Sequence, residues 1–354
     1  MTSVPSLVRF AGPREVQVVE YPDAPLGPRD VRLTTLYSGI SAGTELTAYR
    51  GSNPYLTKSW DPGRRLFVAG DGSGLGYPLD RWGYEEVGRI EELGSAVDPA
   101  LAGQLVYGAW GHASSHVAPE GWAADRLVPP GVAPIAGTFA RSGAIALNAV
   151  LDADVNLGET VAVFGQGVLG LLVTRLCVLA SATVVAVDRV SHRLDLARQF
   201  GAHHVIDAGN DSPAERIREL TDGRGADVSV EVSGSYAALQ EAIRSTAYNS
   251  QVVTVGFLQG GDVALRLGEE FHHNRIQLTC SQISGVNRRL DHRWTRERLE
   301  QTVMRFVADD RLAVTSLVSH VMPVERAGEA FAMLDRGDAG VLQVVLAFAG
   351  EVAR

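Results

Sequence analysis

The stretch VAVFGQGVLGLL, residues 161–172, decides the fold of this 354-residue chain. It sets Gly165, Gly167 and Gly170 in the spacing G-x-G-x-x-G, between a short apolar run typical of a strand and a long one typical of a helix. In such a unit the first glycine permits a tight turn, the second lets the backbone approach a pyrophosphate, and the third lets helix and strand pack closely. The stretch therefore predicts a strand-turn-helix unit that binds a dinucleotide.

The residues that follow extend this predicted cofactor site. Val168 and Leu169 open the helix, where backbone N–H groups without helical partners and the helix dipole favour phosphate. The next apolar run, TVVAVD, ends on Asp188, 18 positions beyond the third glycine. A carboxylate there accepts hydrogen bonds from both ribose hydroxyls and repels a 2′-phosphate, so it favours NAD. Arg189 and Arg193 could instead pair with a 2′-phosphate, so NADP stays open.

Between residues 149 and 287 the apolar runs alternate with amphipathic helical segments. Near-continuous Val and Ile runs in such an alternation predict a parallel sheet covered on both faces, which is a doubly wound α/β domain. The runs ADVSVEV and SQVVTV lead to Ser233 and to Gly256 and Phe257. The cofactor-facing loops of such sheets lie at these strand ends, so we expect the three residues to contact the cofactor.

The residues up to about 148 have a different pattern of apolar and turn residues. Short β-type runs such as EVQVVEY and DVRLTTLY are separated by turn residues such as Gly27-Pro28 and Pro129-Pro130. This pattern is typical of a mostly antiparallel, barrel-like β domain. From about residue 288 a helical segment and a last strand-like run break the rhythm of the middle domain.

Composition limits the partners. The chain is 45% hydrophobic and 21% charged, with a net charge of -9. Nucleic acid and anionic membranes attract clustered Lys and Arg, so we expect neither as a partner, and a small-molecule substrate remains. The opening lacks a basic start with an apolar run, and no run of about 18 apolar residues follows, so we expect a cytoplasmic protein. Cys177 and Cys280 are expected to be small buried hydrophobic residues.

The order of these parts, together with the stretches GYEEVGRIEELGSAV and GADVSVEVSGS, resembles the medium-chain dehydrogenase/reductase superfamily. The resemblance covers nearly the whole chain. It implies a β-rich GroES-like barrel domain formed by residues 1–148 and 288–354, and a Rossmann cofactor-binding domain formed by residues 149–287. The stretches SGISAGTELTAYRG and HHNRIQLTCSQ are most similar to the branch around bacteriochlorophyllide a dehydrogenase.

The resemblance locates the catalytic zinc ligands of the superfamily, and here the chain departs from the pattern. Where zinc-dependent members have G-I-C-G-T-D, this chain reads GISAGTE, with Ser41 and Thr44 and no cysteine. Tyr84 replaces the histidine of the motif G-H-E-x-x-G, and the third ligand falls at about Arg141. Zn²⁺ binds thiolate, imidazole or carboxylate, so hydroxyls and a guanidinium predict catalysis without a metal.

A metal site built from other residues is a less favoured alternative. Its candidate ligands are Glu45, Glu85, Glu86, His112 and His116. If WGHASSHVAP is a strand, its two histidines stand about 13 Å apart, which is too far for one ion. Glu85 is expected instead to orient the backbone or the guanidinium of Arg141.

Tyr84 is the predicted replacement for zinc. Its phenol can hydrogen-bond the substrate oxygen, and a cation such as Arg141 nearby would lower its pKa toward the working range. Ser41 and Thr44 could relay the proton, and His112 could exchange it with solvent. The alternative, that the tyrosine only fills the space left by zinc, stays open.

Three classes of function follow from these residues. The first is a zinc-independent, NAD(P)-dependent oxidoreductase that transfers hydride between nicotinamide and a secondary alcohol or ketone of a small molecule. The second is an enoyl or quinone reductase that uses NADPH on a C=C bond, and the third is a nucleotide-binding protein without turnover. The stretch RIQLTCSQ could be an edge strand, and pairing across a two-fold axis would make a homodimer, as the superfamily implies.

Overall fold

The computed structural model describes residues 4–69, 74–258 and 265–348. The chain divides into two compact units, Met1–Arg141 with Ala313–Arg354, and Ser142–Leu312. Compared with the predicted domains, the second unit also takes in residues 142–148 and 288–312.

Packing explains why these two segments belong to the second unit. Helix α3 (Ala140–Ala153) and helix α8 (Arg296–Ala308) lie so close that a Cβ atom on Gly143 would be 2.4 Å from a methyl group of Val303. Just beyond α8, the carbonyl of Arg311 accepts a hydrogen bond of 2.9 Å from the guanidinium of Arg175. The alternation of strands and helices stops near residue 288, as the sequence pattern indicates. The helix that follows nevertheless packs on the second unit.

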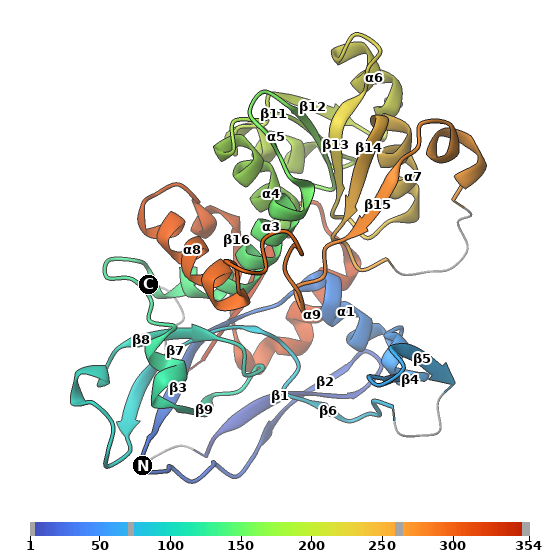
Figure 1. Cartoon of the computed structure of the whole chain (residues 1–354). Coiled ribbons are helices and arrows are strands. Elements are labelled where there is room, and N and C mark those ends of the chain that lie inside the picture. The colour runs from blue at the N-terminus through green and yellow to red at the C-terminus, as the bar shows by residue number, and fades with distance from the viewer. Residues whose placement is uncertain (1–3, 70–73, 259–264, 349–354) are drawn as a thin grey trace. The chain divides into compact units, whose positions relative to one another are not determined.

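The second unit is a six-stranded sheet in the order β12-β11-β10-β13-β14-β15 (Figure 1). Every neighbouring pair of strands is parallel, so the predicted doubly wound α/β domain is confirmed. The strands are β10 (Thr160–Phe164), β11 (Thr183–Asp188), β12 (His204–Asp207), β13 (Ala226–Glu231), β14 (Thr246–Thr254) and β15 (Gln277–Cys280). The connecting helices are α4 (Val168–Leu179), α5 (Ser191–Gln199), α6 (Pro213–Leu220), α7 (Tyr236–Ser245) and the short π-helical turn η4 (Leu267–Phe271).

Apolar side chains on the strands explain why this sheet is buried on both faces. Val161, Ala162 and Val163 on β10 are all buried, because alternate residues of a central strand face helices on opposite sides. Strand β15 ends the sheet, as predicted, and its Cys280 is exposed, whereas the sequence predicted a buried residue. An edge strand lacks the neighbour that would cover it. Cys177, on α4, is buried as predicted.

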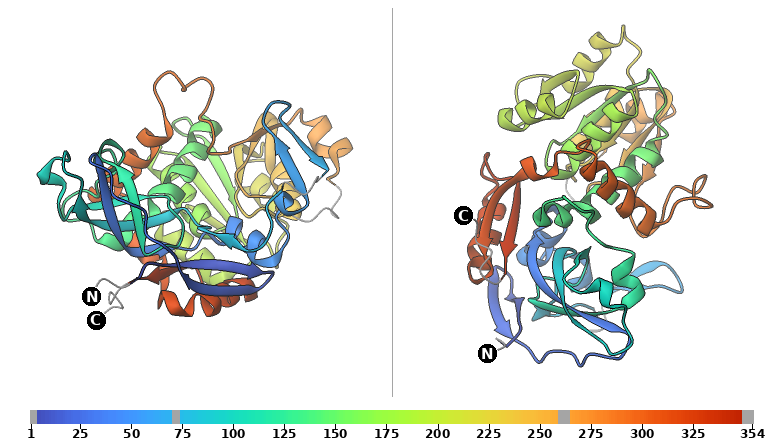
Figure 2. Two further views of the ribbon diagram at one scale, coloured as in Figure 1. Left: turned by 90° about the horizontal axis from the view of Figure 1, so that it is seen from below. Right: turned by 90° about the vertical axis from the view of Figure 1, so that its left-hand side faces the viewer.

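The first unit is rich in antiparallel strands, as predicted, and Figure 2 shows its last strands (red) beside its first ones (blue). Within the described residues its strands form several sheets and not one closed ring. The main sheet runs β16-β17-β3-β7-β8, with β9 also paired to β3. Its strands are β3 (Asp30–Gly39), β7 (Glu85–Leu93), β8 (Leu105–Gly108), β9 (Ser115–Pro119), β16 (Val318–Pro323) and β17 (Gln343–Ala347). Smaller sheets join β1 (Ser6–Gly12), β2 (Glu15–Glu20) and β6 (Leu79–Asp80), and β4 (Lys58–Asp61) with β5 (Leu66–Ala69).

Short helices complete this unit. They are α1 (Ala42–Arg50), α2 (Glu120–Ala124) and α9 (Ala327–Arg336), with the 3₁₀ turns η1 (Pro54–Leu56), η2 (Pro99–Leu101), η3 (Pro134–Phe139), η5 (Val314–Leu317) and η6 (Val324–Arg326).

Helix α1 is held in place by an aromatic core. The ring of Phe331, on α9, packs edge-on against Phe10 with centroids 5.0 Å apart and stacks on Tyr49 of α1 at 5.8 Å. Aromatic pairs of this kind contribute about 0.5 to 1.5 kcal/mol each beyond their buried area. At its other end α1 is tied to α9 by the ion pair of Arg50 with Asp335, at 2.5 Å. A short helix that is marginal by itself thus becomes a rigid support for the residues at its N-terminus.

Hydropathy of the helices adds one finding. Of the helices that the structure describes, none has the length and apolar character needed to cross a lipid bilayer.

Candidate functional site

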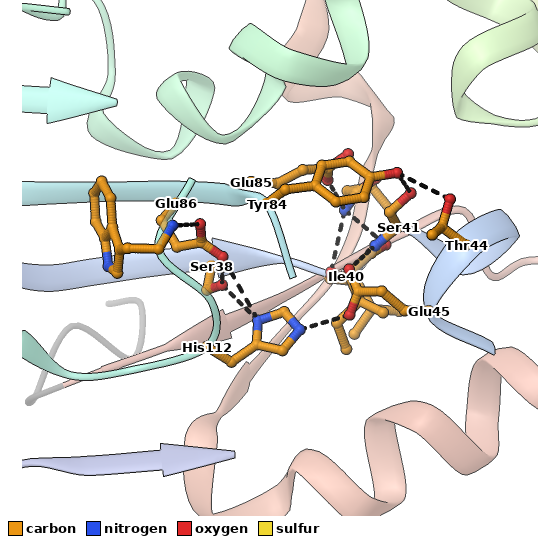
Figure 3. Close-up of polar contacts among 12 residues, drawn as sticks. Ser38, Ile40, Ser41, Thr44, Glu45, Tyr84, Glu85, Glu86 and His112 are labelled. Atoms are coloured by element: carbon orange, nitrogen blue, oxygen red, sulfur yellow. Dashed lines mark hydrogen bonds and ion pairs between the residues drawn. The ribbon is translucent and has the colours of Figure 1, made fainter. Parts of the chain in front are cut away.

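The turn into strand β7 aims Tyr84 at the start of helix α1 (Figure 3). The preceding residue, Gly83, has φ of 118°, in the region that favours glycine. A Cβ atom on Gly83 would also lie 2.8 Å from the imidazole of His112. Backbone conformation and space therefore both require glycine before Tyr84.

Three of the predicted residues meet through their hydroxyl groups. Tyr84 is hydrogen-bonded to Ser41 Oγ, and its hydroxyl also donates to Thr44 Oγ1 at 3.3 Å (Figure 3). Ser41 is the N-cap of α1, yet within the described part of the chain its side chain makes no capping hydrogen bond. Giving up such a cap costs about 1 kcal/mol of helix stability, which indicates that the hydroxyl is held for another purpose.

Glu45, in the first turn of α1, lies directly behind this hydroxyl cluster. Its Oε1 accepts a hydrogen bond of 2.8 Å from the backbone N–H of Ser41, and its Oε2 lies 2.6 Å from Nε2 of His112. Both side chains are fully buried, at 0% exposure. In the sequence, Glu45 stood out only as a candidate metal ligand, and no local pattern predicts this contact.

The buried contacts continue from His112 into the main sheet. Its Nδ1 lies 2.6 Å from Ser38 Oγ, which donates to Glu86 Oε1 at 2.9 Å (Figure 3). The other oxygen of Glu86 accepts the backbone N–H of Trp110 at 2.8 Å. Ser38 and Glu86 are direct partners in the pairing of β3 with β7, which explains why their side chains meet.

The prediction that His112 exchanges protons with solvent is wrong. The imidazole is fully buried and bonds to Glu45 and Ser38. Burial by itself would lower the pKa of His112, but the charge of Glu45, the hydrogen bond to Glu45 and the charge of Glu86 raise the pKa above its ordinary value. Burial raises the pKa of Glu86 to about 7, against the opposing effect of His112. Both shifts favour the protonated forms of His112 and Glu86.

The prediction that a cation lowers the pKa of Tyr84 is also wrong. Loss of hydration around the hydroxyl raises that pKa far above its ordinary value, and the nearby carboxylates of Glu85 and Glu45 raise it further. Hydrogen bonds of the phenol with Ser41 and Thr44 oppose the rise without cancelling it. The phenol is consequently a protonated hydrogen-bond donor at neutral pH, not a phenolate.

Glu85 and Arg141 both lie in the first unit. Adjacent residues on a strand face opposite sides, so Glu85 points away from the Glu86 cluster. Its Oε2 lies 3.2 Å from the amide nitrogen of Gln343, which also donates to the carbonyl of Ile40 at 3.2 Å. Arg141 lies in the first turn of α3 and is half-buried. Its role beside Glu85 stays a prediction.

The residues at the position of a catalytic zinc do not fit that ion. Ser41 and Tyr84 offer neutral hydroxyls, and the buried carboxylate of Glu45 is already paired with His112. Among the described residues no group of three or more His, Cys, Asp or Glu side chains is arranged to hold a metal ion. His116 is stacked on Trp110, with ring centroids 5.3 Å apart.

The glycines of the second unit have the geometry that a phosphate cradle requires. Gly165 has φ of 95°. A Cβ atom on Gly170 would lie 1.8 Å from the carbonyl oxygen of Gly165, so only glycine permits this packing of α4 on β10. At Gly167, the N-cap of α4, a Cβ atom would meet nothing within 4 Å among the described residues. The open side of this turn fits a pyrophosphate at the helix N-terminus, next to Val168 and Leu169.

Asp188 ends β11 beside this turn. Its Oδ2 accepts the backbone N–H of Gln166 at 2.6 Å, and its Oδ1 accepts those of Arg189 and Val190 at 2.7 and 2.9 Å. A carboxylate has about four acceptor sites, so capacity for a ribose hydroxyl remains. Arg189 is exposed, whereas in the described structure Nε of Arg193 is buried without a hydrogen-bond partner.

The other predicted cofactor contacts converge on the same turn. A Cβ atom on Gly165 would lie 2.8 Å from Cβ of Ser233, and one on Gly256 would lie 2.2 Å from the backbone nitrogen of Gly234. The sequence analysis missed the residue that shapes these loops, the buried Glu231. Its Oε1 accepts the backbone N–H of Ser233 at 2.8 Å and that of Gly234 at 3.0 Å. Phe257 is exposed beside them.

Comparisons with known proteins agree with this description. Residues 168–308 match the family model of zinc-binding dehydrogenases. D-guloside 3-dehydrogenase from Escherichia coli (strain K12) is 28% identical over 325 residues, which cover 90% of this chain and 93% of that protein.

Two solved structures share the fold over 98% of this chain and 100% of theirs. One is a protein from Sinorhizobium meliloti 1021 described as a zinc-binding dehydrogenase and bound to NADP, with a TM-score of 0.77 and 21% identity. The other is an alcohol dehydrogenase from Escherichia coli CFT073 in complex with NADH, with a TM-score of 0.75 and 17% identity. The narrower branch around bacteriochlorophyllide a dehydrogenase stays a prediction. The family match and the curated relative support the predicted resemblance to the medium-chain dehydrogenase/reductase superfamily.

Proposed function

We propose that the protein is a zinc-independent, NAD(P)-dependent oxidoreductase that transfers hydride between nicotinamide and a secondary alcohol or ketone. The observation that carries this proposal is the hydroxyl cluster of Tyr84, Ser41 and Thr44. It stands at the sequence positions where zinc-dependent relatives place metal ligands, and its groups do not bind Zn²⁺.

The nicotinamide supplies or accepts the hydride, and the protein controls the proton and the substrate oxygen. Tyr84 keeps its proton at neutral pH because its pKa is raised. A protonated phenol can donate to a carbonyl oxygen and neutralise the negative charge that hydride addition creates there. Ser41 and Thr44 hold the phenol in place. The raised pKa suits Tyr84 to donate a proton when NAD(P)H reduces a ketone, and it makes the phenol a poor base for oxidation of an alcohol.

The glycine turn and Asp188 support a nicotinamide dinucleotide as cofactor, and two structural neighbours hold NADP and NADH. We propose NAD as the preferred form, since the carboxylate of Asp188 lies at the ribose position and would repel a 2′-phosphate. NADP remains the alternative because the Arg193 guanidinium follows on the next helix.

A curated relative supports a proposal for the substrate class. Similarity to D-guloside 3-dehydrogenase over nine-tenths of the chain supports a secondary hydroxyl of a sugar or related polyol. The cluster of neutral hydroxyl groups suits such a substrate, because each can exchange hydrogen bonds with it.

Reduction of a C=C bond with NADPH, as in an enoyl or quinone reductase, is the second candidate. The unpartnered Nε of Arg193 in the described structure favours it, since an arginine there could bind the 2′-phosphate of NADPH. Tyr84 would then protonate carbon, a task for which its raised pKa gives less driving force.

One screen tests the proposal. Dialysed, zinc-free protein is assayed for oxidation of glycosides and polyols with NAD⁺, for reduction of the corresponding ketones with NADH, and for reduction of enones and quinones with NADPH. Turnover of ketones with NADH supports the proposal, and turnover of only enones or quinones supports the second candidate. Nucleotide binding without any turnover would indicate a binding protein.

We further propose a homodimer formed through strand β15. This strand ends the sheet, and its Leu278 is 38% exposed. An uncovered apolar strand edge is a ready site for pairing with the same strand of a second copy.

A further inference from the structure

We propose that Glu45 is a positioning residue, which holds the Ser41 hydroxyl on Tyr84 and is itself anchored through His112 and Ser38 to Glu86. We call these four residues the Glu45 chain: Glu45, His112, Ser38 and Glu86. The inference rests on the proposed function, because the hydroxyl pair matters only if Tyr84 acts on the substrate.

Each residue of the Glu45 chain comes from a different segment. Glu45 lies on α1, His112 between β8 and β9, Ser38 on β3 and Glu86 on β7. The successive contacts, from Glu45 to Glu86, measure 2.6, 2.6 and 2.9 Å, and all four side chains are fully buried. The Glu45 chain therefore fixes the first turn of α1 to the main sheet.

The contacts have a consistent set of donors and acceptors. If the imidazole is protonated, its Nε2 donates to Glu45 and its Nδ1 to Ser38 Oγ, which leaves the Ser38 hydroxyl free to donate to Glu86. Each carboxylate also accepts a backbone N–H, that of Ser41 for Glu45 and that of Trp110 for Glu86. Buried charges are tolerated when every one is paired and hydrogen-bonded, as these are.

The arrangement at Ser41 separates the roles of its backbone and its side chain. A serine at a helix N-cap ordinarily turns its hydroxyl to a backbone N–H of the first turn. Here Glu45 reaches back to the N–H of Ser41 and fixes the backbone, as the carboxylate of a capping box does. The hydroxyl is then directed to Tyr84. Without Glu45 we expect it to turn back to the helix.

Crystal structures of Glu45 variants test this directly. Glu45→Met keeps the length of the side chain but cannot accept the N–H of Ser41, so we expect Ser41 Oγ to leave Tyr84 and bond to the helix backbone. Glu45→Gln keeps one carbonyl oxygen, so we expect the Ser41–Tyr84 contact to persist. A Glu45→Met structure in which Ser41 still bonds to Tyr84 overturns the proposal.

Kinetics supply the second measurement. Displacing the hydroxyl pair should lower kcat for hydride transfer about 10- to 100-fold in Glu45→Met, with KM for the nucleotide unchanged and most of the activity recovered in Glu45→Gln. The control is Asp335→Asn, which removes the ion pairs with Arg14 and Arg50 at the other end of α1. We expect normal kcat in this control, and an equal loss in both variants would point to a general loosening of α1.

If Glu45→Met does not fold, a crystal structure of the unmodified protein decides. Ser41 Oγ bonded to a first-turn N–H of α1 would contradict the inference. The crystallographic tests need neither substrate nor cofactor. They can confirm the role of Glu45 even if no nicotinamide-dependent turnover is found. A lack of turnover would refute the proposed function but not the role of Glu45.

Discussion

Ser41 and Tyr84, 43 positions apart in the chain, share a hydrogen bond between their hydroxyl groups. Ser41 stands at the N-terminus of α1 and Tyr84 immediately before β7. Both residues stand at motif positions to which the sequence resemblance assigns metal ligands. The pair joins the start of α1 to the turn before β7, and its phenol keeps its proton at neutral pH.

Removal of the phenol hydroxyl tests its role as the acid. We expect Tyr84→Phe to lower kcat for ketone reduction by about 10²-fold, since that is a typical loss for a general acid. The free energy of unfolding should change little, because the ring remains. Steady-state kinetics and thermal unfolding measure the two effects. An unchanged kcat would show that the tyrosine only fills space.

Alanine substitutions in the glycine turn at residues 165–170 should distinguish an effect on NADH binding from an effect on folding. A methyl group at residue 167 has room in the described structure, and the backbone conformation there is permitted for alanine, so we expect Gly167→Ala to fold normally. The methyl group would stand where the pyrophosphate approaches. We therefore expect the variant to bind NADH about tenfold or more weakly. Gly170→Ala is the contrasting variant, since its Cβ would collide with the backbone of Gly165 and destabilise the unit. Calorimetric titration and thermal unfolding check both. NADH bound equally well by Gly167→Ala would place the nucleotide elsewhere.

The charge of Asp188 should set the preference between the two nucleotides. We expect the protein to bind NADH more tightly than NADPH, and Asp188→Asn to reduce this ratio about tenfold, because repulsion of the 2′-phosphate is lost. The variant keeps one oxygen to accept the N–H groups of Arg189 and Val190. Dissociation constants for both nucleotides decide. A wild-type protein that binds NADPH more tightly than NADH would indicate that Arg193 binds the 2′-phosphate. It would also favour reduction of a C=C bond, the second candidate function.

The buried carboxylate of Glu86 should make stability depend on pH. Its folded-state pKa of about 7 lies above its ordinary value, so the folded protein binds more protons than the unfolded chain between about pH 4.5 and 7. Stability should therefore fall as pH rises through this window, by on the order of 1 to 3 kcal/mol from this group. The raised pKa of His112 acts in the same direction.

Glu86→Gln isolates this contribution. Thermal unfolding at pH 5, 6, 7 and 8 should show a smaller loss of stability with rising pH in the variant than in the wild type. Glu329→Gln is the control, because Glu329 is exposed and paired with Arg326 on the surface. Parallel profiles for the wild type and Glu86→Gln would mean that Glu86 does not titrate in this range.

The proposed dimer should depend on the edge of β15. We expect Leu278→Lys to convert a dimer to a monomer, because a charge on an edge strand blocks pairing with a second copy. Leu220→Lys is a matched control, since Leu220 is 41% exposed at the end of α6. Light scattering during gel filtration measures both. A dimer that survives Leu278→Lys would need another interface.

Local sequence was sufficient for the cofactor unit. Gly165, Gly167 and Gly170 lie within six residues, and the strand and helix that flank them are recognised by their apolar runs. The missing cysteine and histidine of the zinc motif were equally visible, because a ligand set is a matter of residue type. The fold of the cofactor unit and the residue types near Tyr84 were therefore open to prediction from patterns of short range.

Tertiary structure alone decided the electrostatics of the site. Glu45 and His112 are 67 positions apart, and Ser38 and His112 are 74 apart, so their contacts depend on how β3, β7 and α1 pack. Burial that only this packing creates raises the pKa of Tyr84, where the sequence suggested a fall, and removes His112 from solvent. A sequence specifies which groups can ionise, but the water excluded around them and the charges brought beside them are properties of the folded chain.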